Sequence, residues 1–193
     1  MSLSSYNKKR NFSATPEPAP SVGKGSGKKL IFVVQRHKAT TLHYDFRLEL
    51  HGVLKSWAMP KGPSMNPSDK RLAMMVEDHP LDYASFKGVI PEGNYGAGIV
   101  EIWDHGWYEP ADENFTKKDP EKILEQEIRN GSLKFVLHGK KLRGEFALVR
   151  MKTAQPNAWL LIKHHDRFAT DEAYNSEEMT SPGSPINKAL HKK

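Results

Sequence analysis

The sequence predicts a mainly β domain, either an antiparallel barrel or an antiparallel sandwich, with few helices. The first observation is a series of short segments rich in β-branched, aromatic and aliphatic residues, which favour strands. The second is that turn signals separate these segments, while only one stretch has a clear helical pattern. Many short strands with few helices are typical of both architectures.

The expected strands follow one another through the middle of the chain. They are predicted at residues 30–35, 42–50, 53–59, 71–77, 98–103, 132–139, 142–151 and 158–164. The dipeptide His51-Gly52 follows the second of them, and HGKK at residues 138–141 joins two others. Both sequences suit tight hairpin turns, so neighbouring strands are expected to pair antiparallel.

One helix is expected between the fifth and sixth predicted strands. Asp119 is a favourable N-cap, Pro120 suits the first helical position, and Gly131 suits the residue that ends a helix. Apolar residues such as Leu124 and Ile128 recur at helical spacing and would form a single buried stripe.

The two ends of the chain differ in composition from the middle. Residues 1–28 and 169–193 are rich in Ser, Pro, Gly and Lys. Such segments bury too little apolar surface to offset the entropy lost on ordering. We therefore expect one domain at residues 29–168 between a largely flexible N-terminal tail and a flexible C-terminal tail.

Composition favours a partner that is a polyanion. The 193 residues carry a formal net charge of +6, and Lys and Arg attract phosphates, although a solvated basic surface explains the same charge. The absence of cysteine excludes disulfides, thiolate zinc sites and a cysteine nucleophile. The sequence shows neither a membrane-spanning apolar run nor a secretory leader, so we expect a cytoplasmic protein, and a monomer.

The stretch HYDFRLEL at residues 43–50 carries the strongest chemical signal. Alternate residues of a strand share a face, so His43 and Asp45 lie about 7 Å apart and can bracket one cation. His37, from a neighbouring segment, is a candidate third ligand, and such a trio leaves positions open for water or substrate. Arg47, next on the same face, suits a phosphate. The simpler interpretation is a strand face that only meets solvent.

Three other segments carry weaker signals. His79 precedes a proline and is expected in extended chain, where Glu77 or Asp78 is a candidate to orient its imidazole. Lys61 lies between two prolines in a stiff loop. The glycine-rich sequence PEGNYGAG at residues 91–98 is explained by a loop that needs positive φ angles. Taken singly, each is more often structural than functional.

Taken together, these segments resemble the 3′-phosphoesterase domain of bacterial DNA ligase D, which also has stand-alone bacterial and archaeal relatives. The resemblance is carried by residues 32–64, 70–106 and 159–166 and extends over about residues 7–168. It is more specific than any single motif, because the candidate residues match at consistent spacing.

The resemblance implies a β-barrel core with a few flanking helices and a manganese-dependent activity. Members of this family remove a 3′-terminal ribonucleoside from a primer strand, leaving a 3′-phosphate, and then remove that phosphate to leave a 3′-hydroxyl. The implied partners are a DNA primer–template and a DNA ligase or another end-joining factor. Ligation by two histidines and an aspartate alone admits other divalent ions.

The resemblance also assigns roles to ten residues. They are His37, His43 and Asp45 as metal ligands; Arg47 and His79 as catalytic phosphate ligands; Tyr83 as a support for phosphate removal; Lys61 and Arg71 as lesser site residues; and Arg10 and Glu17 in an N-terminal segment, residues 7–18, that docks on the site. Beyond contacting the phosphate, His79 is a candidate to protonate the leaving oxygen. The attacking group of the first step stays open between the terminal 2′-hydroxyl and water.

Asn11 departs from the family pattern, which usually has aspartate there, so the ribonucleoside-removing step is expected to be weaker if that charge matters. The sequence contains no polymerase or ligase module, and we expect a stand-alone enzyme. Two other functions fit parts of the sequence. One is a nucleic-acid-binding barrel with a vestigial metal site, and the other is a metal-dependent phosphatase of small molecules. The complete set of ligands and phosphate-binding residues argues against the first.

Overall fold

The structure is a computed structural model that describes residues 2–25, 27, 29–112, 119–153 and 155–191. Residues 1, 26, 28, 192 and 193 of the two predicted tails lie outside this description. The elements are α1 (Leu3–Lys8), β1 (Leu30–Lys38), β2 (Leu42–Leu50), β3 (Val53–Met59), β4 (Lys70–Pro80), the 3₁₀ helix η1 (Leu81–Ser85), β5 (Gly88–Ile90), β6 (Gly98–Pro110), α2 (Pro120–Asn130), β7 (Ser132–Gly139), β8 (Arg143–Arg150), β9 (Ala158–Lys163) and α3 (Pro185–Leu190).

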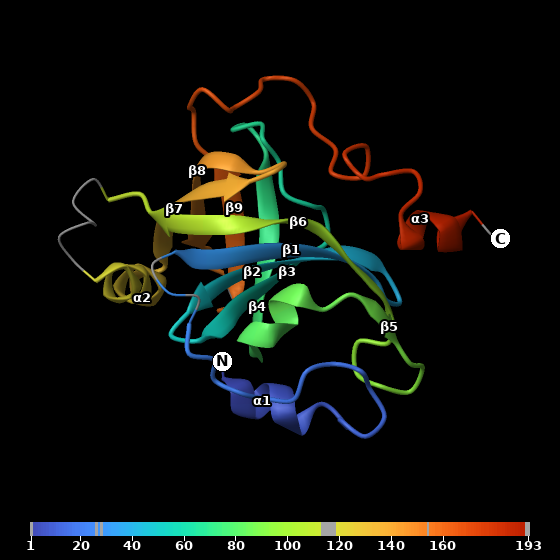
Figure 1. The fold of residues 1–193 in the computed structure, drawn as a ribbon. Helices are drawn as coiled ribbons and strands as arrows, with labels where there is room; N and C mark the ends of the chain where they lie inside the picture. The colour runs from blue at the N-terminus through green and yellow to red at the C-terminus, as the bar shows by residue number, and fades with distance from the viewer. Residues whose placement is uncertain (1, 26, 28, 113–118, 154, 192–193) are drawn as a thin grey trace.

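The strands form a closed antiparallel barrel. Neighbours pair in the order β1-β2-β3-β4-β9-β8-β7-β6, and β6 pairs back with β1 to close the ring, while the short β5 extends the edge of β6 (Figure 1). Closure removes the free sheet edges that an open sandwich would expose. Of the two predicted architectures, the barrel is confirmed.

The barrel interior is filled by the apolar face of each alternating strand. Phe46, Trp57, Phe135 and Phe146 are fully buried there and make ring-to-ring contacts with one another. On β2 the opposite face carries the polar residues of the HYDFRLEL stretch. The pleat therefore places the candidate site outside the apolar core, on the outer face of β1 and β2.

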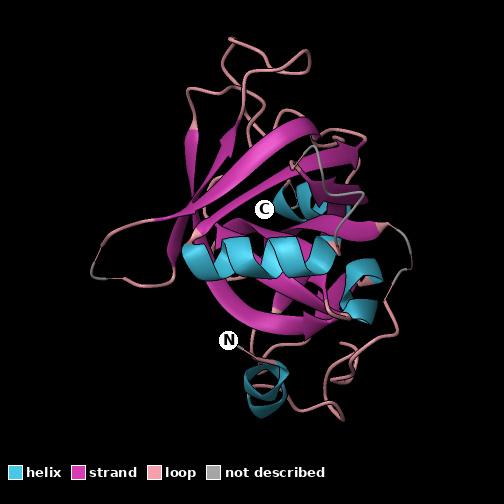
Figure 2. Cartoon of the chain, turned by 90° about the vertical axis from the view of Figure 1, so that its left-hand side faces the viewer, coloured by secondary structure: helices cyan, strands magenta, loops and turns pink. Residues whose placement is uncertain are grey.

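Local signals in the sequence placed the turns and the long helix correctly. His51 and Gly52 have φ angles of 51° and 72° in the β2–β3 turn, as a tight hairpin requires. Asp119 accepts a hydrogen bond from the Glu121 N–H and begins α2, and Gly131, with a φ of 79°, ends it. The helix lies across the strands and buries Leu124 against the core (Figure 2).

Three strands are longer than predicted. β1 continues to Lys38, β4 to Pro80 and β6 to Pro110, beyond the apolar runs that marked them. The extension of β1 includes Arg36, whose guanidinium is fully buried among Glu101 and Glu177. Charged residues such as Arg36 interrupt the apolar pattern that marks a strand. In the structure, ion pairs with residues distant in sequence keep Arg36 in the sheet.

Both ends of the chain pack on the barrel. In α1, Tyr6 is completely buried, and in α3, Ile186 is completely buried. We expect flexible segments here because apolar residues are sparse in both. In the structure, each short helix packs on the barrel through its one buried residue. Among the described helices, none combines the length and the apolarity that crossing a membrane requires.

Candidate metal and phosphate site

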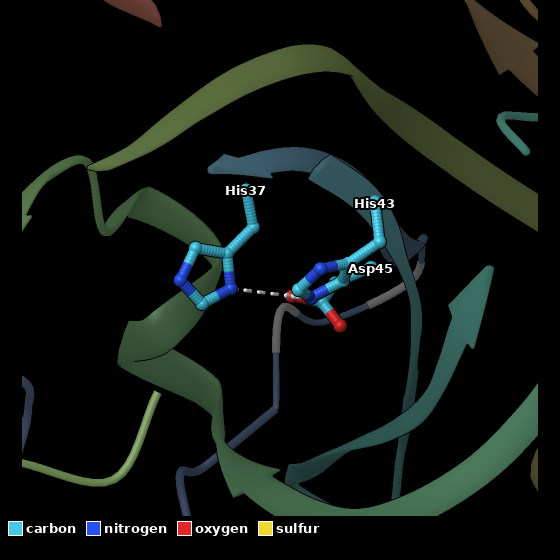
Figure 3. A group of neighbouring side chains, drawn as sticks. All are labelled: His37, His43 and Asp45. Carbon is cyan, nitrogen blue, oxygen red and sulfur yellow. Dashed lines mark ion pairs between the residues drawn. The ribbon is translucent and has the colours of Figure 1, made fainter. Parts of the chain in front are cut away.

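Two histidines and one carboxylate converge on the outer face of β1 and β2. His37 lies on β1 itself, directly opposite His43 of β2, and Asp45 follows on the same face. One ligand atom from each residue lies within 4.8 Å of the others (Figure 3). Asp45 Oδ2 is 3.6 Å from His37 Nδ1 and 3.8 Å from His43 Nε2. Among the described residues, no other group of three or more such side chains meets this condition.

Backbone carbonyls orient both imidazoles. His37 Nε2 is 2.9 Å from the Gly96 carbonyl, and His43 Nδ1 is 3.0 Å from the Thr41 carbonyl. A carbonyl only accepts, so each of these nitrogens carries the proton, and the other nitrogen of each ring turns a lone pair toward Asp45. Metal-binding histidines are held in this way. The donor set therefore fits a divalent cation held by His37, His43 and Asp45.

Asp45 remains ionised although it is buried. Burial alone would raise the pKa of its carboxyl, but the nearby Arg47 guanidinium outweighs burial and holds that pKa well below its usual range. Arg47 Nη2 lies 3.2 Å from Asp45 Oδ2. The trio thus has an anionic ligand at any ordinary pH.

Arg47 is aimed by its neighbours and keeps one free donor. Its Nε donates to Gln35 Oε1 at 2.7 Å, and its guanidinium lies 4.9 Å from the centre of the Tyr83 ring. Gln35 in turn donates to the carbonyls of Tyr83 and Phe86. Arg47 Nη1 is buried and has no hydrogen-bond partner among the described residues. A buried donor without a partner is costly, and an anionic oxygen in the site would satisfy it.

His79 is neutral in this structure. Burial, together with the nearby Arg47 and Arg10 guanidinium groups, holds the pKa of its imidazole well below 6.5. Its Nδ1 donates to the Glu77 carbonyl at 2.9 Å, so its Nε2 presents a lone pair, 3.4 Å from Arg10 Nη2. In this state His79 cannot donate a proton from Nε2, which the expected role as an acid requires.

The carboxylates expected to orient His79 have other partners. The Glu77 carboxylate bonds Lys9 and Arg10, and only its backbone carbonyl contacts the imidazole. Asp78 pairs with Lys55 at 2.8 Å. β4 is irregular at these two acids, because its pairing with β3 shifts register between Leu54 and Ser56.

The N-terminal segment reaches the site. The Tyr6 ring lies 5.0 Å from the His79 ring and 6.1 Å from the Tyr83 ring, measured between centres. Glu17 Oε1 accepts hydrogen bonds from Arg10 Nε at 2.8 Å and from the Tyr83 hydroxyl at 2.9 Å. Burial and the Glu17 carboxylate keep this hydroxyl protonated by raising the pKa of Tyr83.

Asn11 lies next to this network without joining it. Its side chain is exposed, and Oδ1 accepts from the N–H and the hydroxyl of Ser13. Asn11 thus closes a local turn, a role that the acceptor oxygen of an aspartate also fills.

Eight of the ten predicted site residues line one cavity of about 170 Å³. They are Arg10, Glu17, His37, His43, Asp45, Arg47, His79 and Tyr83. Lys61 and Arg71 line a different cavity, of about 350 Å³, together with residues of the C-terminal segment. Arg71 Nη2 donates there to Asp69 and to the Tyr174 carbonyl. The role of these two residues stays a prediction.

Sequence reasoning missed the residues that position the site. Gln35 holds Arg47, and Gly96 holds His37 with its carbonyl. A glutamine that ends the apolar run LIFVV was a usable signal, because a buried amide needs specific partners. The part played by Gly96 had no such signal, since a backbone carbonyl is present at every residue.

Comparison with known proteins gives a consistent result. The sequence model of the DNA ligase D 3′-phosphoesterase domain family matches residues 35–150 of this chain. The chain is 49% identical over 166 residues to a multifunctional non-homologous end joining protein LigD of Pseudomonas aeruginosa, covering 85% of this chain and 19% of that protein. LigD of Mycolicibacterium smegmatis is 43% identical over 165 residues, covering 86% and 21%.

A third relative agrees. LigD of Mycobacterium tuberculosis, a multifunctional non-homologous end joining DNA repair protein, is 45% identical over 148 residues, covering 77% of this chain and 18% of the relative. The chain therefore spans about a fifth of the length of the relatives named here. The matched segment contains the whole metal trio, Arg47 and His79. The chain belongs to the DNA ligase D 3′-phosphoesterase domain family.

Proposed function

We propose that this chain is a manganese-dependent phosphoesterase that processes the 3′ ends of DNA in non-homologous end joining. It removes a 3′-terminal ribonucleoside from a primer strand and then the remaining 3′-phosphate, leaving a hydroxyl for ligation. Family membership supports the class of reaction, and the site supports an anionic substrate held beside a cation.

The observation that carries the proposal is the unpartnered Nη1 of Arg47 beside the metal trio. Gln35 and Asp45 already hold the rest of the guanidinium, so Nη1 is the donor left for a substrate. A phosphate oxygen there would receive a fixed, charge-assisted hydrogen bond. His37, His43 and Asp45 would hold a divalent ion, which would supply the remaining charge neutralisation at the reacting phosphate.

His79 has a second role that depends on the substrate. Its Nε2 lone pair faces the cavity while burial, Arg47 and Arg10 depress its pKa. A bound phosphate brings negative charge that opposes this depression, so His79 takes up a proton when substrate binds. The protonated ring then donates to a phosphate oxygen and delivers the proton to the leaving oxygen.

Turnover of a 5′-labelled primer ending in one ribonucleotide, annealed to a template, tests the proposal. Gel electrophoresis resolves the starting primer, the 3′-phosphate product and the 3′-hydroxyl product over time. We expect both products in order with Mn²⁺ and neither in EDTA. Binding of the primer without conversion, in any divalent ion, would instead support the nucleic-acid-binding barrel.

The variant Arg47→Lys separates charge from geometry. Lysine keeps the positive charge but cannot bond the glutamine, the aspartate and a phosphate at fixed angles. We expect kcat to fall by roughly a hundredfold, because the lost contact acts on the reacting phosphate. The control Arg143→Lys changes an exposed arginine outside the cavity and should leave kcat unchanged.

A further inference from the structure

One aromatic side chain stands at the mouth of the metal and phosphate cavity. Tyr95, on the glycine-rich loop that precedes β6, lines this cavity and is 49% exposed. By contrast, His79 and Tyr83 in the same cavity are each 3% exposed. Tyr95 is therefore the cavity residue with a large ring surface open to an incoming strand.

Contacts with the N-terminal segment and the backbone of the loop fix the position of this ring. Lys9 Nζ lies 4.7 Å and Arg10 Cζ 5.3 Å from the ring centre, and Lys9 also donates to the Tyr95 hydroxyl at 3.3 Å. The next residue, Gly96, has a φ of 76° and bonds His37 through its carbonyl. The ring is thus attached directly to the residue that orients a metal ligand, and little ordering remains when a substrate binds.

The size of the cavity decides what lies inside it. A volume of about 170 Å³ is well below the roughly 300–1,000 Å³ of pockets that enclose drug-sized molecules. An ion and a phosphate group fit such a space, but a whole nucleoside does not. The nucleoside attached to the phosphate must then lie at the mouth, where Tyr95 is exposed.

We propose that Tyr95 stacks on the base of the nucleotide that carries the 3′-phosphate. This inference rests on the proposed function, since it takes the bound phosphate to belong to a DNA end. Stacking on an aromatic ring accepts every base, which suits an enzyme that meets ends of any sequence. Tyr95 is then a substrate-positioning residue whose partner is the base and not the phosphate.

Fluorescence anisotropy of labelled primer–templates in EDTA tests the stacking without turnover. Both primers end in a 3′-phosphate, and the last nucleotide of one carries a natural base, while that of the other is an abasic tetrahydrofuran. For the primer with a base, we expect Tyr95→Ala to weaken binding roughly tenfold. For the abasic primer, the wild type and Tyr95→Ala should have equal affinity. That affinity should equal the affinity of Tyr95→Ala for the primer with a base.

Two further variants serve as controls for the ring itself. Tyr95→Phe loses the hydroxyl that Lys9 contacts but keeps the ring, so it should bind like the wild type. Phe168→Ala removes an exposed ring beside Arg167 in another cavity and should change nothing.

Equal weakening on both primers, or none on either, would overturn the stacking role. Equal weakening would show that the loop acts through Gly96 or Lys9. The same samples separate this inference from the proposed function. Base-dependent binding through Tyr95 with no phosphate release by the wild type in Mn²⁺ would refute the esterase activity and leave the stacking intact.

Discussion

At the scale of single residues, the site depends on protons whose positions the backbone fixes. The carbonyls of Thr41 and Gly96 each take one imidazole N–H, and this leaves a lone pair of His43 and of His37 facing Asp45. His43 and Asp45 could be predicted from their spacing in HYDFRLEL, and His37 from the segment before it. The choice of nitrogen could not, because it depends on a loop nearly sixty residues away in the case of His37.

Asp45→Asn should abolish metal binding and leave the fold intact. Asparagine has nearly the same shape but removes the only anionic ligand of the trio. We expect Mn²⁺ to raise the melting temperature of the wild type and not that of the variant, and turnover to fall at least a hundredfold. The control Asp82→Asn changes an exposed carboxylate outside the cavity. Metal stabilisation retained in Asp45→Asn would show that the ion binds elsewhere.

At the scale of elements, the strands were predictable and the end segments were not. β2, β3 and β7 begin and end where the pattern placed them, because each alternates or has a clear turn beside it. The short α1 has no amphipathic pattern, and its position depends on Tyr6, which is buried against the barrel. A single aromatic residue in a polar segment gives no periodic signal, so only the contact itself reveals the docking.

Removal of the first 18 residues should lower both activity and thermal stability. The deletion takes away the buried Tyr6 ring and the Arg10–Glu17 pair that contacts His79 and Tyr83. The single change Tyr6→Ala should alone lower the free energy of unfolding by about 3 kcal/mol, the usual scale for a buried aromatic. Chemical denaturation measures the loss. A truncated protein with unchanged stability would mean that this segment does not dock in solution.

The docking of this segment should also depend on pH through Glu77. Burial opposes ionisation of the Glu77 carboxyl, but hydrogen bonds from Lys9 and Arg10 outweigh burial and lower its pKa below the usual value of 4.5. A lowered folded-state pKa stabilises the fold fully above pH 4.5, and the contribution is lost as pH falls through the folded value. The stability gap between wild type and Glu77→Gln should therefore be full above pH 4.5 and shrink as the pH falls below that value. A constant gap would contradict this role.

At the scale of the whole molecule, the C-terminal segment contacts β1 and β2, the two strands that carry the metal trio, on the side opposite the trio. Arg36 and Tyr44 are paired across β1 and β2, each next to a histidine of the trio but facing the opposite side. Glu177 accepts hydrogen bonds from both of them, and Asn187 also accepts one from Arg36. The composition of residues 169–193 predicts a flexible tail. The sequence does not reveal how this segment packs, because its polar residues bond to partners more than 130 positions away in the chain.

Glu177→Ala should therefore weaken the fold and the metal site together. Arg36 is fully buried, so loss of this partner leaves part of its charge uncompensated, although Glu101 still pairs with it. A loss of about 2 kcal/mol would lower the melting temperature by roughly 4–8 °C in a chain of this size. Since β1 and β2 then hold each other less firmly, Mn²⁺ affinity measured by calorimetry should fall severalfold. The neighbouring exposed Glu178, changed to alanine, should alter neither quantity. A stability loss with unchanged Mn²⁺ affinity would show that the segment braces the barrel without supporting the site.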